Sequence, residues 1–416
     1  MSQQFVLPGS YKKWTIGLIA VGLLAVLYGF IVYHPFAHAG HGQNVNSTHF
    51  WAALLQNSVY FLLLVNTAMF FMCITTMAMG GWQIAFRRVM EAVSSAVPVM
   101  GVLTLIILMA IVWGGRSDIY HWLDKSAVAS DDVLNGKKGF LNPVFYSVFS
   151  IVTVFLWWIL GKKMRSLSHQ TDKGPMDYET GKKWIWNNTV YASLFTVVFT
   201  LSVASTLSWF WLMSIDPHWY STMYSWYTFA STFVAGISLF TIFVVWLKNK
   251  GQLEYVNEEH LHDLGKFIFA FSVFWAYLWF SQYMLIWYSN QPEETKYFVE
   301  RFGTAEKAGP YKAIFFINII INFLAPLLIL MMRGSKRNWT LITFMAVLMV
   351  FGHWLDFYQM VMPGTLHEHG SMGLFDFGVA CLFIGLIMWS VGRYITRYPL
   401  DPKYHPFMKE SMIHHT

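Results

Sequence analysis

The strongest constraint on this chain is a series of ten apolar runs, each long enough to cross a membrane as a helix. A spanning helix needs about 20 mostly apolar residues, because lipid offers no hydrogen bonds to an open backbone. The runs are continuous and not alternating, which excludes a closed β-barrel. We therefore expect an all-α polytopic membrane protein with ten transmembrane helices. The expected spans are Trp14–Tyr33, Trp51–Gly80, Val97–Trp113, Leu141–Leu160, Asn188–Leu212, Met223–Leu247, Phe267–Trp287, Ala313–Met332, Leu341–Met362 and Met372–Val391.

Composition excludes several other classes of protein. Only 12% of the residues are charged and 56% are hydrophobic, whereas a soluble domain is about 25% charged. Cys73 and Cys381 are too few for a disulfide framework, a cysteine zinc site or an Fe–S cluster held by this chain alone. The sequence also has no haem-attachment motif and no Gly-rich phosphate loop. We expect no cofactor or metal to be bound by this chain.

The basic residues are distributed unevenly between the two sides of the expected bundle. With the N-terminus in the cytoplasm, 20 of the 28 Lys and Arg residues fall in cytoplasmic segments and the rest on the opposite side. Cytoplasmic loops carry such an excess, so both termini are expected to be cytoplasmic. The same bias explains the net charge of +6 without nucleic-acid binding. The first run is too long for the apolar part of a signal peptide and is interpreted as a helix.

No segment has the composition of a separate soluble domain, so residues 1–416 are expected to form a single integral membrane domain. Spans two to five (51–160 and 188–212) and spans six to nine (223–362) cross the membrane in the same order of directions. This order predicts two four-helix bundles related by an axis along the membrane normal. The first and last spans, 14–33 and 372–391, are expected to flank the bundles.

Polar residues at membrane depth are costly and therefore mark candidate sites. In span nine, His353, Asp356 and Gln359 are spaced i, i+3 and i+6, so neighbours in the series share a helix face. Asp376, at the start of span ten, is also expected in the outer half. Three interpretations are open: a proton-conducting half-channel, a quinone head-group pocket, or a His–Asp hydrogen bond that fixes packing. The polar residues of spans two and seven that can join this group are Asn57, Tyr277, Ser281, Gln282 and Tyr283.

A second polar group lies at the inner end of span three, where Glu91, Ser94 and Ser95 are spaced to share a face. It is interpreted either as a cytoplasmic entry for protons or as an ion pair of Glu91 with Arg87 or Arg88 at the membrane surface. Two other polar sets are weaker candidates.

Asn318 and Asn322 in span eight lie near mid-membrane, where they either bridge the two polar groups or join helices. The outer-loop histidines either bind a metal or, more simply, contact a partner. They are His34, His38 and His41 after span one, and His367-Glu368-His369 before span ten.

The most distinctive stretch runs from Phe271 to Thr295 and reads FSVFWAYLWFSQYMLIWYSNQPEET. It is preceded by His262-Asp263-Leu264-Gly265-Lys266 and followed later by Gly352-His353-Trp354-Leu355-Asp356. With these motifs the chain resembles the ActF-type membrane subunits of bacterial alternative complex III, within the wider family of polysulfide reductase and NrfD-like membrane subunits. The resemblance covers nearly the whole chain and includes the ten-span layout.

The resemblance implies a place in electron transport. Alternative complex III is a quinol:cytochrome c, or quinol:oxidase, oxidoreductase of the bacterial inner membrane. The implied partners are a sister NrfD-like membrane subunit that is given the quinol site, periplasmic Fe–S and haem c subunits, and in some cases a terminal oxidase. The ActF-type subunit itself carries no redox centre, and a role in moving protons has been proposed for it. The proton-path candidates on this chain are Glu91, Ser94, Ser95, Asn318, Asn322, His353, Asp356 and Asp376.

Two other functions stay open. The chain can itself be the quinol-binding catalytic subunit, with menaquinone or a lipid in the bundle. The quinone-pocket candidates are Tyr277, Gln282, Tyr283, His353 and Asp356. The chain can instead be a free-standing secondary transporter, a class that often interrupts helices at mid-membrane. Pro326 is the single proline well inside an expected span, so this second alternative has little support from the sequence.

Overall fold

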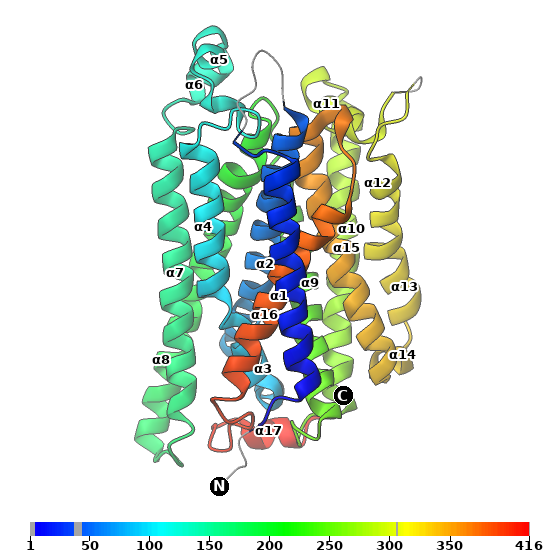
Figure 1. Cartoon of the computed structure of the whole chain (residues 1–416). Coiled ribbons are helices and arrows are strands. Elements are labelled where there is room, and N and C mark those ends of the chain that lie inside the picture. Colours follow the sequence, from blue (N-terminus) through cyan, green and yellow to red (C-terminus); the bar gives the residue numbers. More distant parts are fainter. Residues whose placement is uncertain (1–4, 37–43, 305–306, 416) are drawn as a thin grey trace.

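A computed structural model describes residues 5–36, 44–304 and 307–415 (Figure 1). Within these ranges it contains ten helical segments that are long and apolar enough to cross a membrane, one for each expected span. The described residues form no strand beyond an isolated bridge between Gly303 and Ala308. The expectation of an all-α polytopic membrane protein is confirmed.

Most spanning helices follow one another with short connections, and the longest connections are residues 114–142 and 290–311. Two of them contain a π-helical stretch, η3 and η5. The spanning elements are α1 (Gly9–Val32), α2 (Val45–Met77), α4 (Val97–Trp113), α7 (Pro143–Gln170), α8 (Tyr178–Ser202) with η3 (Val203–Leu212), α9 (Thr222–Asn249), α10 (Glu258–Ser289), α12 (Lys312–Ile319) with η5 (Ile320–Leu324) and α13 (Ala325–Leu330), α15 (Trp339–Leu366) and α16 (Leu374–Ile395).

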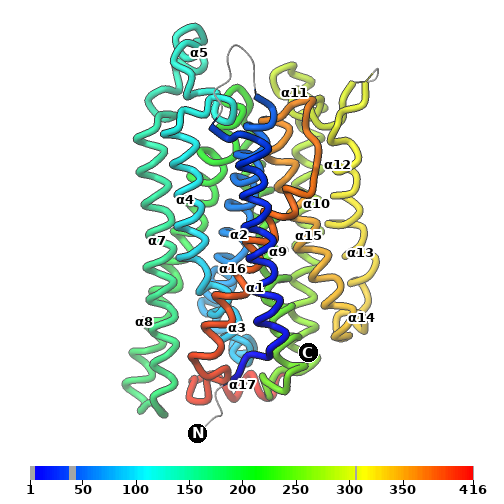
Figure 2. The backbone as a smooth tube through the Cα atoms, viewed as in Figure 1, coloured from blue at the N-terminus to red at the C-terminus, as the bar shows by residue number. Residues whose placement is uncertain are grey.

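The remaining elements are short and lie near the two ends of the bundle. They are η1 (Gly81–Phe86), α3 (Arg87–Ser94), η2 (His121–Leu123), α5 (Lys125–Ser130), α6 (Asp132–Lys137), η4 (Met213–Ile215), α11 (Pro292–Phe302), α14 (Arg333–Arg337), η6 (His367–His369) and α17 (Met408–Met412). Both chain ends lie at the same end of the bundle, with α17 and α14, and we call this the terminal end (Figures 1 and 2). The helices α5, α6 and α11 lie at the opposite end, the far end.

The centre of the molecule is α2, which is buried along nearly its whole length. It contacts α4 and α8 on one side, α9 and α15 on another, and α16 on a third. The helices α2, α4, α7 and α8 contact one another in sequence, and so do α9, α10, the α12–α13 segment and α15. A symmetry axis that relates these two sets of four stays a prediction. A helix that is packed on all sides needs apolar residues all round. This explains why the apolar run of the second span, Trp51–Gly80, is so long.

The first and last spans pack closely on each other, on the face of α2 turned to the viewer in Figure 1. Two glycines allow this approach. A Cβ atom at Gly22 would lie 2.5 Å from the backbone of Leu382, and one at Gly385 would lie 2.9 Å from the Ile19 nitrogen. Small residues at such crossings let helix backbones meet in lipid, where packing rather than the hydrophobic effect holds helices together.

Several helices extend beyond their apolar runs because polar caps fix their ends. The helix α10 begins at Glu258, although the expected span begins at Phe267. The Asn257 side chain accepts hydrogen bonds from the backbone N–H groups of Glu259 and His260, at 3.0 and 3.1 Å. A cap of this kind satisfies the open N–H groups of a first turn. Hydrophobic composition therefore locates the membrane-crossing part of a helix, but it does not show how many further helical turns extend beyond the apolar run.

Candidate functional site

A buried carboxylate in the far half of α15 is surrounded by hydrogen-bond donors from two neighbouring helices, α9 and α10. Asp356 is fully buried. Its Oδ2 accepts from Ser231 of α9 at 2.7 Å and from the Trp275 indole of α10 at 2.9 Å. Its Oδ1 accepts from the Tyr227 hydroxyl, also on α9. We name Asp356, His353, Tyr227, Ser231 and Trp275 the Asp356 cluster. Its donors are neutral, and no Lys or Arg of the described chain is ion-paired with the carboxylate.

The histidine of this cluster has one nitrogen engaged and one without a partner. His353 Nδ1 lies 3.0 Å from Ser231 Oγ and 3.9 Å from Asp356 Oδ2. Because the Ser231 hydroxyl has one hydrogen and donates it to Asp356, Nδ1 is the donor towards Ser231. His353 Nε2 is buried and makes no hydrogen bond with the described protein atoms. That nitrogen keeps a free lone pair, on a ring whose other nitrogen lies 3.9 Å from the Asp356 carboxylate.

A small polar cavity adjoins the cluster on its far side. Tyr227 lines this cavity together with Gln282, Asn318, Arg301 and Gln359. Each of the last four residues also has a buried polar atom that makes no hydrogen bond with the described protein atoms: Gln282 Nε2, Asn318 Oδ1, Arg301 Nε and Gln359 Oε1. The cavity volume is about 10 Å³, close to the least that holds a water molecule. Aromatic rings such as Trp279 and Phe315 form much of its wall, and the polar side chains among them offer a water hydrogen bonds.

The outer wall of the cavity belongs to α11, outside the spanning segments. Arg301 is buried there, stacks 3.4 Å from the centre of the Tyr297 ring, and donates to the Gln359 carbonyl at 2.7 Å. Burial raises the pKa of Tyr297, while the Arg301 guanidinium acts in the opposite direction. The phenol therefore stays protonated near neutral pH. The cavity links the Asp356 cluster to a cation near the far surface.

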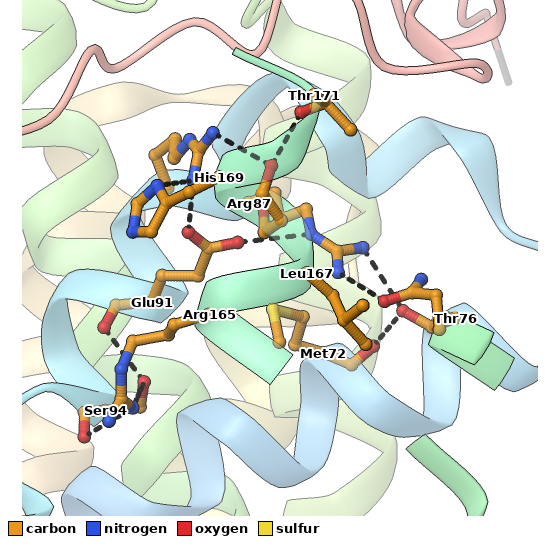
Figure 3. A network of polar contacts seen from close by, with 12 residues as sticks. Met72, Thr76, Arg87, Glu91, Ser94, Arg165, Leu167, His169 and Thr171 are labelled. Atoms are coloured by element: carbon orange, nitrogen blue, oxygen red, sulfur yellow. Dashed lines mark hydrogen bonds and ion pairs between the residues drawn. The ribbon is translucent and has the colours of Figure 1, made fainter. Parts of the chain in front are cut away.

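The second buried carboxylate, Glu91 of α3, has a different environment (Figure 3). Its two oxygens meet Arg87 Nε at 3.2 Å and Arg88 at 2.7 Å. Tyr394 of α16 donates to the same carboxylate at 2.9 Å. Arg88 also pairs with Asp172 at 2.5 Å. We name these five residues the Glu91 cluster. The ion-pair interpretation is thus what the structure contains, but the pair is fully buried and not at an exposed surface.

The two serines predicted with Glu91 make local bonds. Ser94 donates to the Glu91 carbonyl at 2.9 Å and accepts from Arg165 of α7 at 3.0 Å. Ser95 donates to the Ala92 carbonyl at 2.6 Å. Figure 3 shows Arg165 reaching the end of α3 beside Ser94. These contacts tie α3 to α7 and leave neither serine side chain in a chain of relays.

A histidine from the C-terminal segment lies next to the Glu91 cluster, outside the spanning segments. His405 is buried against the Trp184 ring, with 5.1 Å between ring centres. Its Nδ1 accepts from the Phe407 N–H at 3.2 Å. Burial lowers the pKa of His405 well below its ordinary value, and the nearby Arg87 and Arg88 act in the same direction. The folded protein holds this ring neutral.

Asp376 forms a third site, separate from the Asp356 cluster. Its Oδ2 accepts from the Gly373 N–H at 2.8 Å, which caps the first turn of α16. Its Oδ1 lies 3.0 Å from His49 Nε2, on α2. The first contact is local to α16 and the second holds the start of α16 against α2, so a structural role accounts for the burial of Asp376.

The other candidates are scattered. Asn322 donates to the Gly352 carbonyl at 3.1 Å, which joins η5 to α15. Asn57 accepts from the Trp354 indole at 2.8 Å. Tyr277 is 62% exposed on the outer surface of α10, away from Gln282. Tyr283 packs on the Phe298 ring. The quinone-pocket candidates therefore do not line a common pocket.

The histidine-rich outer loops form exposed pairs. Glu368 pairs with Lys307 at 2.5 Å, and His367 lies 3.5 Å from Glu300. His38 and His41 lie outside the described residues. In the part of the chain that the structure describes, no three His, Cys, Asp or Glu side chains are grouped to hold a metal ion.

Sequence reasoning missed three of the five members of the Asp356 cluster. Tyr227 and Ser231 are spaced i, i+4 in span six, so they share a face, and this spacing was an available signal. No sequence signal indicated Trp275, because tryptophan is common in membrane spans and the partner of its indole N–H depends on helix packing.

No protein-family model matches this sequence, and no curated protein matches it closely enough to show a relationship. The chemistry of the two clusters therefore rests on their geometry.

Proposed function

We propose that this chain is a membrane subunit, without a redox centre of its own, of a quinol-oxidising respiratory complex, and that it carries protons at the Asp356 cluster. The resemblance of the Phe271–Thr295 run to ActF-type subunits supports the complex. The ten spanning helices agree with such a subunit. Its partners would be a sister membrane subunit, Fe–S and haem c subunits, and in some assemblies a terminal oxidase.

The observation that carries the proton proposal is the bond from Tyr227 to Asp356, because Tyr227 also lines the polar cavity. A water in that cavity takes up a proton from the far side and passes one of its own to the Tyr227 oxygen, while the Tyr227 hydrogen moves to Asp356 Oδ1, so that water and phenol end unchanged and Asp356 is protonated. Release runs in reverse. His353 accepts a proton at Nε2 and returns it, so the cluster has two neighbouring groups that change charge.

The orientation that fits this proposal places the terminal end in the cytoplasm. The excess of Lys and Arg on that side supports it. The cavity and α11 then face the periplasm of a bacterial inner membrane, on the side where the redox subunits would dock. Protons taken up or released at Asp356 would exchange with the periplasmic side by way of the cavity.

The quinol-binding alternative has less support. A quinone ring needs far more room than the cavity of about 10 Å³ that Gln282 lines. Tyr277 points outward and Tyr283 packs against α11. The chain's own residues near Asp356 do not fit a quinone head group, so the proposal assigns quinol oxidation to a partner subunit.

The transporter alternative has one observation in its favour. The π-helical stretches η3 and η5 interrupt two spans, and Pro326 follows η5. Such interruptions often mark functional sites and are used by carriers. Purification in mild detergent separates the two classes. A haem spectrum and Fe–S subunits that copurify support the complex, and transport by the chain alone in liposomes supports the carrier.

The test of proton transfer uses the purified complex in liposomes with Asp356→Asn. The variant should keep quinol oxidation in the presence of an uncoupler and lose proton release by roughly 10²-fold. Asp376→Asn is the matched control, because it removes the charge of a buried aspartate that already has a structural partner. Undiminished proton release by Asp356→Asn removes this residue from the path.

A further inference from the structure

A basic groove opens at the terminal end between α7 and α16, with a volume of about 550 Å³. Lys162 and Arg165 line it from α7, Arg393 lines it from α16, and Arg397 lines it from the turn beyond α16. His169 lies between the two helices. It stacks on the Tyr398 ring, with 3.9 Å between ring centres, and lies 3.0 Å from the Tyr394 hydroxyl. These contacts give the groove a fixed floor.

The four cations lack carboxylate partners. Among the described residues none of the four forms an ion pair, and no Asp or Glu lines the groove. Arg393 and Arg397 lie over the rings of Trp389 and Tyr398, and Lys162 lies over Trp158, all at 5.6–5.7 Å. The nearby acids, Glu91 and Asp172, are already paired with Arg87 and Arg88 behind the floor. Four cations without carboxylate partners make the groove a favourable binding site for an anion.

The groove lies where the hydrocarbon of a membrane gives way to head groups. It is formed by the last turns of two spanning helices. Trp158 and Trp389 are partly exposed beside it, as aromatic side chains are at membrane interfaces. From Val99 at its edge, an outward stripe continues along α4 through Val102 and Ile106, which are 57% and 59% exposed. The spacing i, i+3, i+7 makes this one apolar face.

We propose that the groove binds the head group of an anionic phospholipid, with an acyl chain lying on the Val99–Ile106 stripe of α4. Phosphate oxygens match the guanidinium donors of Arg165, Arg393 and Arg397. Basic pockets between spanning helices are known to select such lipids. With four cations in the groove, a lipid with two phosphates is a better match than a lipid with one. The inference is independent of the proton function proposed above.

The test is native mass spectrometry of the full chain, taken from nanodiscs that contain diphosphatidylglycerol in phosphatidylethanolamine. Wild type should retain the diphosphatidylglycerol, and the double variant Arg393→Gln with Arg397→Gln should bind it roughly 30-fold more weakly at low salt. Lys12→Gln with Lys13→Gln, an exposed pair at the same end, makes the same change in charge and should change binding far less.

Conservative variants keep the test decisive if the double glutamine variant does not fold. Arg393→Lys with Arg397→Lys should keep most of the binding, and Lys162→Gln alone should weaken it by a smaller factor. Equal losses in the groove variant and the Lys12 and Lys13 control would overturn the proposal. Equal retention of phosphatidylethanolamine, or displacement of the lipid by millimolar inorganic phosphate, would also overturn it.

Discussion

The two buried carboxylates of this protein differ in the charge of their partners. Glu91 lies between two guanidinium groups, at 2.7 and 3.2 Å. Asp356 accepts from a tyrosine, a serine and a tryptophan, and a histidine nitrogen lies 3.9 Å from one of its oxygens. A guanidinium beside a carboxylate adds a full opposite charge to its hydrogen bond, whereas a hydroxyl or an indole adds the hydrogen bond alone. Burial alone does not identify a proton carrier.

The two environments fit different roles: a structural one for Glu91 and the proposed proton transfer for Asp356. The Glu91 cluster joins α3, α7 and α16 at the terminal end. The Asp356 cluster joins α9, α10 and α15 in the far half and has a polar cavity beside it. Losing Glu91 should therefore cost mainly stability, and losing Asp356 should cost mainly function.

The largest effect is expected from Glu91→Gln. The variant leaves Arg87 and Arg88 with one carboxylate between them, so the free energy of unfolding should fall by about 3–5 kcal/mol. Thermal unfolding in detergent, followed by circular dichroism, measures it. A variant as stable as wild type would mean that the guanidinium groups find other partners. It would contradict the structural role assigned to Glu91.

A smaller loss of stability is expected from Asp356→Asn. The amide oxygen can still accept from Ser231 and Trp275, and the unmatched contacts cost about 1–3 kcal/mol. The same unfolding assay, applied to both variants, shows which of Asp356→Asn and Glu91→Gln loses more stability. If Asp356→Asn is the less stable variant, the Asp356 cluster is a packing device and its assignment as a proton carrier loses its basis.

Asp376→Asn should cost less again, about 0.5–2 kcal/mol, the range for the loss of a helix cap. An asparagine keeps an acceptor for the Gly373 N–H and a partner for His49. Proton release by the reconstituted complex should not change. A loss of proton release equal to that of Asp356→Asn would extend the path to His49 and Asp376, which the structure places in a separate contact.

The smallest effect is a dependence on pH that His405 introduces next to the Glu91 cluster. The ring is neutral in the folded protein, because burial and two arginines lower its pKa. In the unfolded chain it takes up a proton below about pH 6.5, so the folded state loses up to about 1.4 kcal/mol for each further unit of acidification. Above that pH the contribution is fully present. Unfolding at pH 7 and pH 5.5 should show a smaller difference in His405→Gln than in wild type, and an equal difference would contradict the assignment.

The sequence predicted the fold more completely than the site. All ten spans could be located, and α4 begins and ends where its apolar run does, because lipid imposes one length and one polarity on every crossing. The pairing of Glu91 with Arg88 or Arg87 was also open to prediction, since i, i+3 and i, i+4 neighbours on a helix meet. Local spacing determined both results.

The partners of Asp356 were not predictable in the same way. Tyr227 and Trp275 lie 129 and 81 residues away in the chain, and which helix faces meet depends on packing that periodicity does not encode. For the same reason, the expected bridge of Asn318 and Asn322 between the two polar groups is not formed by the pair together. Asn318 lines the far cavity, whereas Asn322 bonds to the α15 backbone.

The most direct measurement of the central claim is infrared difference spectroscopy of the purified complex, recorded between the resting state and turnover with quinol. We predict a carboxylic acid C=O band that changes during turnover in wild type and in Glu91→Gln and is absent from Asp356→Asn. A band that disappears with Glu91 and not with Asp356, or no such band at all, would contradict the proposal.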